Sequence, residues 1–272
     1  MDASLLILLP VLGCMTGFLA GLFGVGGGMI LTPFLTLLLS YGGRFPPEAI
    51  VHIAIATSMG TILFTSASSL RAHAKHKAVI WPAFWQLIPG ILLGGLLGAR
   101  IAGWLSTFWI AIIFTSFVMV SATKIFISKG PTSSRDLPGP VGMGIAGLSI
   151  GTIASIVGAG GGFLIVPFLT WCKATIHKAI GTSAALGFPI SVAGTIGYIW
   201  SGLSVPSLQG YSGLIGYIYW PALLAVAVCS TLTAPLGAKL AHNLDTKKLR
   251  YLFALLLYCL GAYMLYKAIR AY

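Results

Sequence analysis

Two glycine-rich motifs occupy equivalent positions in this chain, and both suit the binding of a small anion. Gly24-Val25-Gly26-Gly27-Gly28 precedes Pro33 by five residues, and Gly158-Ala159-Gly160-Gly161-Gly162 precedes Pro167 by the same spacing. A helix that begins at such a motif leaves its first backbone N–H groups without intrahelical partners, and its dipole attracts negative charge. The predicted anion ligands are the backbone groups of Gly26, Gly27 and Gly28 and of Gly160, Gly161 and Gly162.

A second repeated pattern, His-x4-Thr-Ser, offers neutral hydroxyl donors. It consists of His52, Thr57 and Ser58 in one copy and His177, Thr182 and Ser183 in the other. Hydroxyl groups can bind an oxyanion without trapping it, so we add both Thr-Ser pairs to the predicted ligands. The alternative is that they bond to their own helix or to a neighbouring one. The two histidines lie near predicted helix starts, which leaves interfacial anchoring and a proton or anion relay open.

Acidic side chains are informative because they are scarce. The chain has 16 Lys and Arg residues but only four carboxylates, Asp2, Glu48, Asp136 and Asp245, each near a terminus or in a predicted loop. A transporter of cations ordinarily places carboxylates within its apolar segments, so an anionic or neutral cargo is favoured. Arg100 and Lys239 occupy equivalent positions at predicted helix ends, where they either relay anions inward or extend to the membrane interface.

The elements that must position these residues are membrane-spanning helices. The chain of 272 residues is 57% hydrophobic and 7% charged, with a mean hydropathy of +0.97, whereas roughly a quarter of the residues of a soluble domain are charged. Most apolar segments reach or nearly reach across a hydrocarbon core of about 30 Å, but 160–172 is too short. The segments are 4–21, 24–40, 49–70, 79–98, 107–127, 141–157, 160–172, 179–201, 214–236 and 249–268. The net charge of +12 reflects membrane orientation rather than nucleic-acid binding, since the basic residues are scattered among loops and helix ends.

An internal duplication organises the segments. Trp81-Pro82 recurs as Trp220-Pro221, and Gly98-Ala99-Arg100 recurs as Gly237-Ala238-Lys239, in the same order as the two patterns above. The sequence therefore predicts an N-terminal transmembrane repeat over 1–127, a cytoplasmic linker rich in Ser, Pro and Gly over 128–140, and a C-terminal transmembrane repeat over 141–272.

The distribution of basic residues favours a reversal of the chain at each glycine-rich motif. If each motif lay inside one continuous helix, the 16 basic residues would divide equally between the two sides of the membrane. If the chain instead turns back there, each half has an odd number of crossings and the second half is inverted, with 12 of the 16 on one side. The positive-inside rule then makes that side cytoplasmic and predicts both termini outside.

The repeated motifs also resemble those of a known family. The paired Gly-x-Gly-Gly-Gly motifs each followed by Pro, the two Ala-x-x-Thr-Ser segments, and Gly187-Phe188-Pro189 leading into Gly194-Thr195-Ile196-Gly197-Tyr198 are similar to the sulfite exporter (TauE/SafE) family over essentially the whole chain. The resemblance implies a duplicated inner-membrane transporter, with family members that move sulfite, sulfonates such as sulfoacetate, and related organic anions. It marks the same glycines, threonines and serines as functional and does not name the substrate.

We therefore predict an all-α polytopic membrane protein with two inverted repeats, each with a broken or re-entrant glycine-rich helix hairpin plus three spanning helices. It is expected to be a secondary transporter that exports a small sulfur-containing anion by alternating access. A channel, or an uptake transporter for another sulfur oxyanion or short organic acid, is the alternative. No nucleophile–base–acid set, metal-type spacing or nucleotide-binding motif occurs in the sequence, so we expect neither an enzyme nor a cofactor. The expected partners are the small anionic substrate (sulfite or a sulfonate) and the lipid bilayer, with no nucleic acid; a homo-oligomer is left open.

Overall fold

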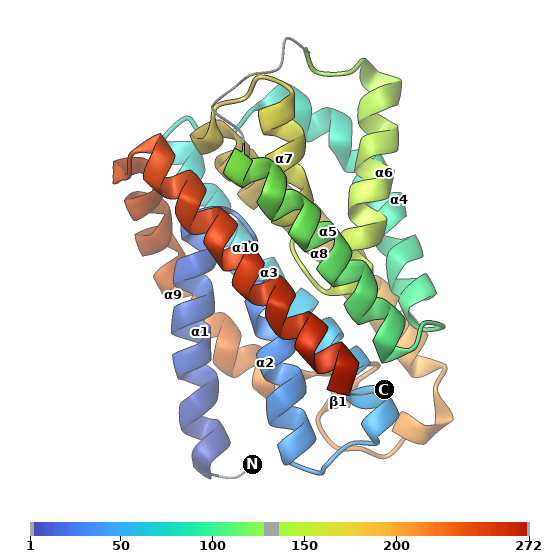
Figure 1. Ribbon diagram of the computed structural model, residues 1–272. Helices are drawn as coiled ribbons and strands as arrows, with labels where there is room; N and C mark the ends of the chain where they lie inside the picture. Colours follow the sequence, from blue (N-terminus) through green and yellow to red (C-terminus); the bar gives the residue numbers. More distant parts are fainter. Residues whose placement is uncertain (1–2, 128–135, 271–272) are drawn as a thin grey trace.

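The computed structural model describes residues 3–127 and 136–270 as a bundle of helices with one short β-hairpin (Figure 1). The α-helices are α1 (Ala3–Phe23), α2 (Gly28–Tyr41), α3 (Pro47–Lys75), α4 (Trp81–Ala102), α5 (Thr107–Ile127), α6 (Pro140–Val157), α7 (Gly162–Trp171), α8 (Ile176–Leu203), α9 (Trp220–Asn243) and α10 (Thr246–Arg270). A 3-10 turn, η1 (Pro206–Leu208), and the strands β1 (Leu214–Ile215) and β2 (Ile218–Tyr219) connect α8 to α9. The predicted all-α class is confirmed.

Several of these helices have the length and apolar character of membrane spans. Among the described residues, α3, α4, α6, α8 and α9 are long and apolar enough to cross a bilayer. α7 has 10 residues, so the prediction that this segment is too short to cross unaided is confirmed. α5 ends at Ile127 and α6 begins at Pro140. The predicted linker 128–140 joins them, and its residues 128–135 lie outside the described part of the chain.

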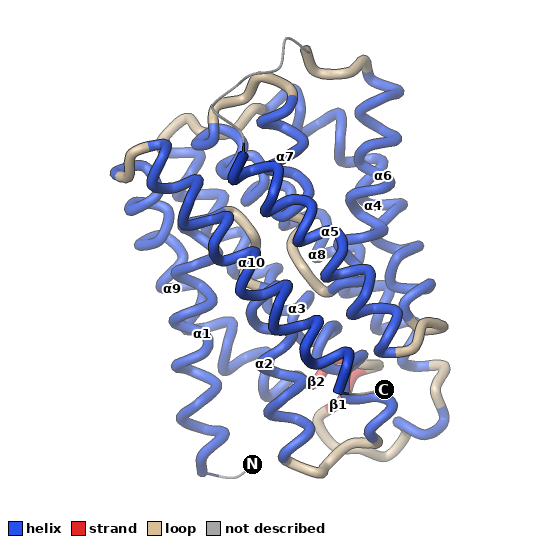
Figure 2. Tube along the Cα trace, in the orientation of Figure 1, coloured by secondary structure: helices blue, strands red, loops and turns tan. Residues whose placement is uncertain are grey.

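Both glycine-rich motifs break the helical path. α1 ends at Phe23 and α2 begins at Gly28, and α6 ends at Val157 and α7 begins at Gly162. Gly24, Gly26 and Gly27 have φ of +65°, +75° and +80°, a left-handed conformation that costs other residues roughly 1–2 kcal/mol each. The predicted start of the second apolar segment at residue 24 is therefore wrong by four residues. Figure 2 shows the two breaks as short loops in the middle of the molecule.

The two halves place matching helices in matching contacts. α1 packs along α9, α6 packs along α4, and α3 and α8 cross in the interior. In Figure 1, α1 rises from the lower end and α2 descends back to it, whereas α6 descends from the upper end and α7 returns to it. These directions are those expected of inverted repeats, and the inverted relation itself stays a prediction that we take up below.

Small residues allow the outer helix pairs to approach closely. A Cβ added to Gly21 of α1 would lie 1.9 Å from the carbonyl oxygen of Ala234 in α9. A Cβ added to Gly94 of α4 would lie 2.2 Å from the carbonyl oxygen of Leu148 in α6. Backbones in such contact leave no room for a side chain, which is how glycine promotes helix association in membranes.

The β-hairpin corrects one predicted boundary. The apolar segment predicted over 214–236 is helical only from Trp220. Its first residues pair as antiparallel strands, Leu214 with Tyr219 and Ile215 with Ile218. The reversal depends on Gly216, whose φ is +58°, a value that interrupts a helix and suits a tight turn.

Candidate functional site

The two glycine-rich breaks meet in the interior of the molecule. A Cβ added to Gly26 would lie 3.1 Å from the Cα of Gly160, and one added to Gly160 would lie 2.8 Å from the carbonyl oxygen of Val25. Both motifs are buried throughout. The structure thus brings together the two glycine triplets, although they are more than a hundred residues apart in sequence. Close packing accounts for part of their glycine content.

The short helices α2 and α7 start at this meeting point, and the first N–H groups of α2 have no acceptor. Gly27 and Gly161, the N-cap residues, are left-handed and provide no side-chain cap. The N–H groups of Ile30 and Leu31 donate to the Gly27 carbonyl at 3.2 and 3.0 Å. Among the described residues, the preceding N–H groups of Gly28 and Met29 have no hydrogen-bond acceptor. Buried, unpaired N–H groups at a helix N-terminus are the arrangement that binds an anion.

The serine of each His-x4-Thr-Ser pattern donates a hydrogen bond to the glycine motif of the opposite half. Ser58 Oγ donates to the Gly158 carbonyl at 3.2 Å, and Ser183 Oγ donates to the Gly24 carbonyl at 2.8 Å. Both side chains are fully buried. The equivalent serine of each half thus holds the first glycine of the other half's motif.

The threonines make a second pair of equivalent contacts. Thr57 Oγ1 accepts the N–H of Tyr219 at 3.0 Å, and Thr182 Oγ1 accepts the N–H of Ile80 at 2.8 Å. Each donor directly precedes a Trp-Pro pair that opens α9 or α4. All four predicted hydroxyls are therefore engaged by protein groups here, and their role as anion ligands stays a prediction.

A line of buried hydroxyls on α3 was missed by the sequence reasoning. Thr61 and Thr65 each donate to the carbonyl four residues earlier, at 2.9 and 3.1 Å, and Thr65 Oγ1 also lies 2.6 Å from Ser230 Oγ of α9. Their spacing of four from Thr57 places them on one helix face, which was the available signal. Thr57, Thr61 and Thr65 thus form one row of hydroxyls that runs along α3 toward its C-terminal end.

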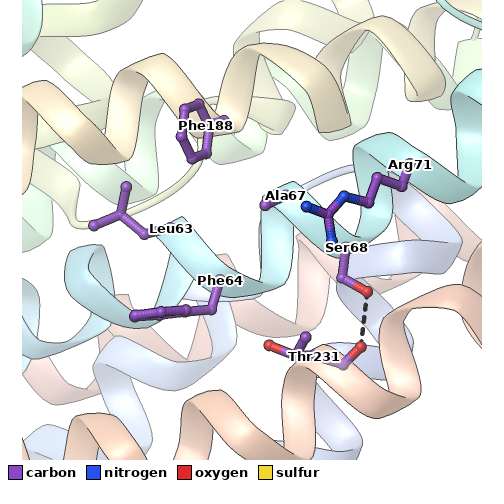
Figure 3. A pocket seen from close by; sticks show the side chains of 7 residues that line it. All are labelled: Leu63, Phe64, Ala67, Ser68, Arg71, Phe188 and Thr231. Carbon is purple, nitrogen blue, oxygen red and sulfur yellow. Dashed lines mark hydrogen bonds between the residues drawn. The ribbon is translucent and has the colours of Figure 1, made fainter.

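A pocket of about 390 Å³ opens between α3, α8 and α9 (Figure 3). It is lined by Leu63, Phe64, Ala67, Ser68, Arg71, Phe188 and Thr231. Leu63 follows Ile62 in sequence, and the Ile62 side chain would lie 3.0 Å from a Cβ added to Gly26. Phe188 follows Gly187, and a Cβ added to Gly187 would lie 3.6 Å from the Gly160 carbonyl oxygen. Two lining residues are thus sequence neighbours of residues that pack on the motifs, and Arg71 is the charged group in the lining.

The remaining predicted residues lie away from the glycine motifs. His52 contacts the Ala102 carbonyl oxygen through Nε2 at 3.0 Å, and His177 has a buried Nε2 with no hydrogen-bond partner. Arg100 and Lys239 are exposed on α4 and α9, and the Arg100 guanidinium carbon lies 5.8 Å from the centre of the Trp104 ring. An exposed cation stacked on tryptophan suits an interfacial position.

Comparison with known proteins gives a consistent assignment. The family model described as sulfite exporter TauE/SafE matches residues 9–264. A "probable membrane transporter protein" of Haemophilus influenzae is 36% identical over 97% of this chain and 99% of its own. Relatives with the same description from Methanocaldococcus jannaschii and Bacillus subtilis are 27% and 25% identical, each over 97% of this chain and 98% of their own. No solved structure matches the chain.

Proposed function

The chain belongs to the sulfite exporter TauE/SafE family of membrane transporters, and from this premise we propose that it moves a small sulfur-containing anion, sulfite or an organosulfonate, out of the cell by alternating access. The observation that carries the proposal is the meeting of the two glycine-rich breaks, where Gly26 and Gly160 touch and α2 and α7 begin. Two helix N-termini that converge in the membrane interior offer a site for one anion.

The polar groups around this meeting point suit a charge that must be released again. The proposed ligands are the N–H groups at Gly26, Gly27 and Gly28 and at Gly160, Gly161 and Gly162, with the hydroxyls of both Thr-Ser pairs completing the shell. Ser58 and Ser183 now donate to glycine carbonyls, so anion binding would exchange those bonds for bonds to the oxyanion. Such an exchange would loosen one half from the other, which is the event that alternating access requires.

The pocket between α3, α8 and α9 is the proposed entry route. Arg71 supplies a positive charge at this pocket, and Leu63, Phe64 and Phe188 supply its apolar wall. This lining suits a sulfonate that carries a short carbon chain as well as inorganic sulfite. Export of an anion at an inside-negative potential is favourable by about 2.3 kcal/mol per charge per 100 mV, so outward transport needs no nucleotide hydrolysis.

We propose inverted repeats in the cell inner membrane, with both termini outside. The support is the distribution of basic residues, because the inverted arrangement collects 12 of the 16 on one side. That side includes Arg71, Lys75 and Lys77 at the end of α3 and Lys239, Lys247 and Lys248 near the junction of α9 and α10.

Counterflow in proteoliposomes tests the proposed function. Vesicles loaded with unlabelled sulfite or sulfoacetate should take up the labelled anion faster than empty vesicles, because a carrier exchanges its cargo across the membrane. A channel would pass the anion without acceleration from the opposite side. Absence of counterflow with both anions, in protein that is folded and inserted, would reject the proposal.

A further inference from the structure

Four of the five histidines gather at one end of the bundle, where the ends of three helices meet. They are His73 and His76 at the end of α3, His177 at the start of α8 and His242 at the end of α9. His73 Nδ1 lies 3.0 Å from His242 Nε2. The ring of His242 stacks on those of His76 and His177, with centres 4.2 and 5.9 Å apart. No sequence pattern indicates this cluster, because its members come from distant segments.

The hydrogen bonds of the His73–His242 pair define how its protons are arranged. His73 Nε2 lies 2.9 Å from the carbonyl oxygen of Gly21 in α1. A carbonyl oxygen can only accept, so Nε2 carries a proton, and in the neutral ring Nδ1 is the acceptor. His242 must then donate from Nε2, which leaves its Nδ1 as a free base. Both nitrogens of His73 are engaged, so neither is free to bind a metal ion.

The cluster leads from the surface to the interior. His76 is exposed, His242 is partly buried and His73 is completely buried. Each member touches the next through a ring contact or a hydrogen bond. The last group, the Gly21 carbonyl, lies in the final turn of α1, three residues before the first glycine of the motif. A proton on this pair therefore acts close to the helix break.

The other end of the molecule has a related cluster in which Tyr198 and Tyr217 take the places of His73 and His242. Tyr198 follows His177 by the same 21 residues that separate His73 from His52. Its hydroxyl donates to the Ser155 carbonyl at 2.8 Å, and Ser155, like Gly21, lies three residues before its glycine-rich motif.

Tyr217 takes the part of His242 in this second cluster. Tyr217 lies edge-on to Tyr198 and stacks on His52, with ring centres 6.4 and 5.4 Å apart, as His242 lies edge-on to His73 and stacks on His177. A tyrosine thus makes the same structural bond that His73 makes. Burial raises the pKa of the Tyr217 hydroxyl above its ordinary value, so the Tyr198–Tyr217 pair stays neutral near neutral pH.

We propose that the His73–His242 pair binds the proton that is coupled to anion transport, which rests on the function proposed above. Uptake begins with a proton from water that adds to His242 Nδ1 and gives an imidazolium. Transfer of its Nε2 proton across the 3.0 Å contact to His73 Nδ1 then leaves His242 neutral and His73 charged. No proton is created or lost in this transfer, and its reversal returns the proton to water.

The surrounding charge links this proton to the anion. The charged side chains at this end of the helices that meet here are all exposed, and α1 contributes no charged side chain within Ala3–Phe23. They are Arg71, Lys75, Lys77, Lys178, Lys239, Asp245, Lys247 and Lys248. An added positive charge among these cations is disfavoured, and a nearby anion offsets it. Binding of proton and anion at this end is therefore mutually favourable.

The test uses sulfoacetate in proteoliposomes, because its sulfonate and carboxylate both stay ionised near neutral pH. With the membrane potential clamped at zero, a gradient of one pH unit should support about tenfold accumulation for one proton per anion. His242→Gln and His73→Gln should reduce this pH-driven accumulation to the level without a gradient. The result is expressed relative to counterflow in the same vesicles, so that a general loss of activity does not imitate loss of coupling.

Tyr198→Phe is the matched control, because it removes the equivalent bond to the Ser155 carbonyl at the other end. It should keep pH-driven accumulation. Retention of that accumulation in both histidine variants, or its absence in the wild type while counterflow is present, would overturn the proton site alone. Absence of wild-type counterflow would instead defeat the proposed function and this inference with it. If the variants carry no flux, the proton uptake of the detergent-solubilised protein is measured on addition of sulfoacetate. Uptake by His242→Gln equal to that of the wild type would count against the proton site.

Discussion

Replacement of Gly26 by alanine tests whether the contact between the two breaks holds the halves together. Gly26 has φ +75°, and its added Cβ would lie 3.0 Å from Ile62 Cγ2 and 3.1 Å from the Gly160 Cα. A left-handed alanine costs roughly 1–2 kcal/mol, and overpacking of a filled interior adds about 1–3 kcal/mol. We therefore expect Gly26→Ala to lower the free energy of unfolding by about 2–5 kcal/mol.

Gly43→Ala separates the two contributions. Gly43 is also left-handed, with φ +56°, but nothing lies within 4 Å of an added Cβ. This variant should therefore lose only the conformational cost of roughly 1–2 kcal/mol. Denaturant titration of both variants in detergent gives the two values, and counterflow gives the functional effect. Equal destabilisation would refute the conclusion that the motifs are in close contact, and full counterflow in a destabilised Gly26→Ala would mean that the contact serves folding alone.

Three further predictions follow from the packing and the hydrogen bonds. Ser58→Ala and Ser183→Ala should each destabilise the protein by about 0.6–1.7 kcal/mol, from the average to the largest value measured for hydrogen bonds inside one membrane protein. Ser66→Ala should cost less because the hydrogen bonds that its hydroxyl makes to described residues stay within α3, at the carbonyls of Ile62 and Leu63; a larger loss in Ser66→Ala by denaturant titration would contradict the role of Ser58 and Ser183 in joining the halves. Gly94→Ala should disrupt the contact of α4 with α6 because its Cβ would lie 2.2 Å from the Leu148 carbonyl oxygen, whereas Gly144→Ala should be tolerated because nothing lies within 4 Å of its Cβ. A melting temperature of Gly94→Ala at or above that of Gly144→Ala would be inconsistent with this interface. Arg71→Gln should raise the KM for sulfoacetate in flux assays because it removes the positive charge from the pocket. Arg100→Gln should raise the KM less, because Arg100 is an exposed residue beside Trp104; an unchanged KM in Arg71→Gln would show that the pocket is not part of the entry route.

The sequence predicted the helical class, the repeated motifs and the short seventh helix because these depend on local composition. Triple glycine is a poor helix sequence wherever it occurs, and a segment of about ten apolar residues is too short to span a bilayer in any context. The hairpin after α8 was missed because Leu214 to Tyr219 is as apolar as a helix, and only the conformation of Gly216 reverses the chain there.

The contacts between the halves were beyond sequence reasoning. The motifs identified Ser58 and Ser183 as donors, but not that each would bond to the other half's glycine motif. The repeat pairs His52 with His177, but His73 aligns with Tyr198, so a search for identical residues passes over the most informative position in the duplication.

The exchange of His73 for Tyr198 shows how the two halves of a duplicated protein can share a structural bond and differ in their chemistry. The hydrogen bonds that His73 and Tyr198 make are equivalent, since each side chain donates to a carbonyl just before a glycine-rich break. With Tyr198 and Tyr217 in the places of His73 and His242, the bond to the carbonyl is kept in both halves, and a pair of imidazoles joined by a hydrogen bond occurs at one end. Coupling then depends on which end can change its charge, and the packing of the two halves need not differ.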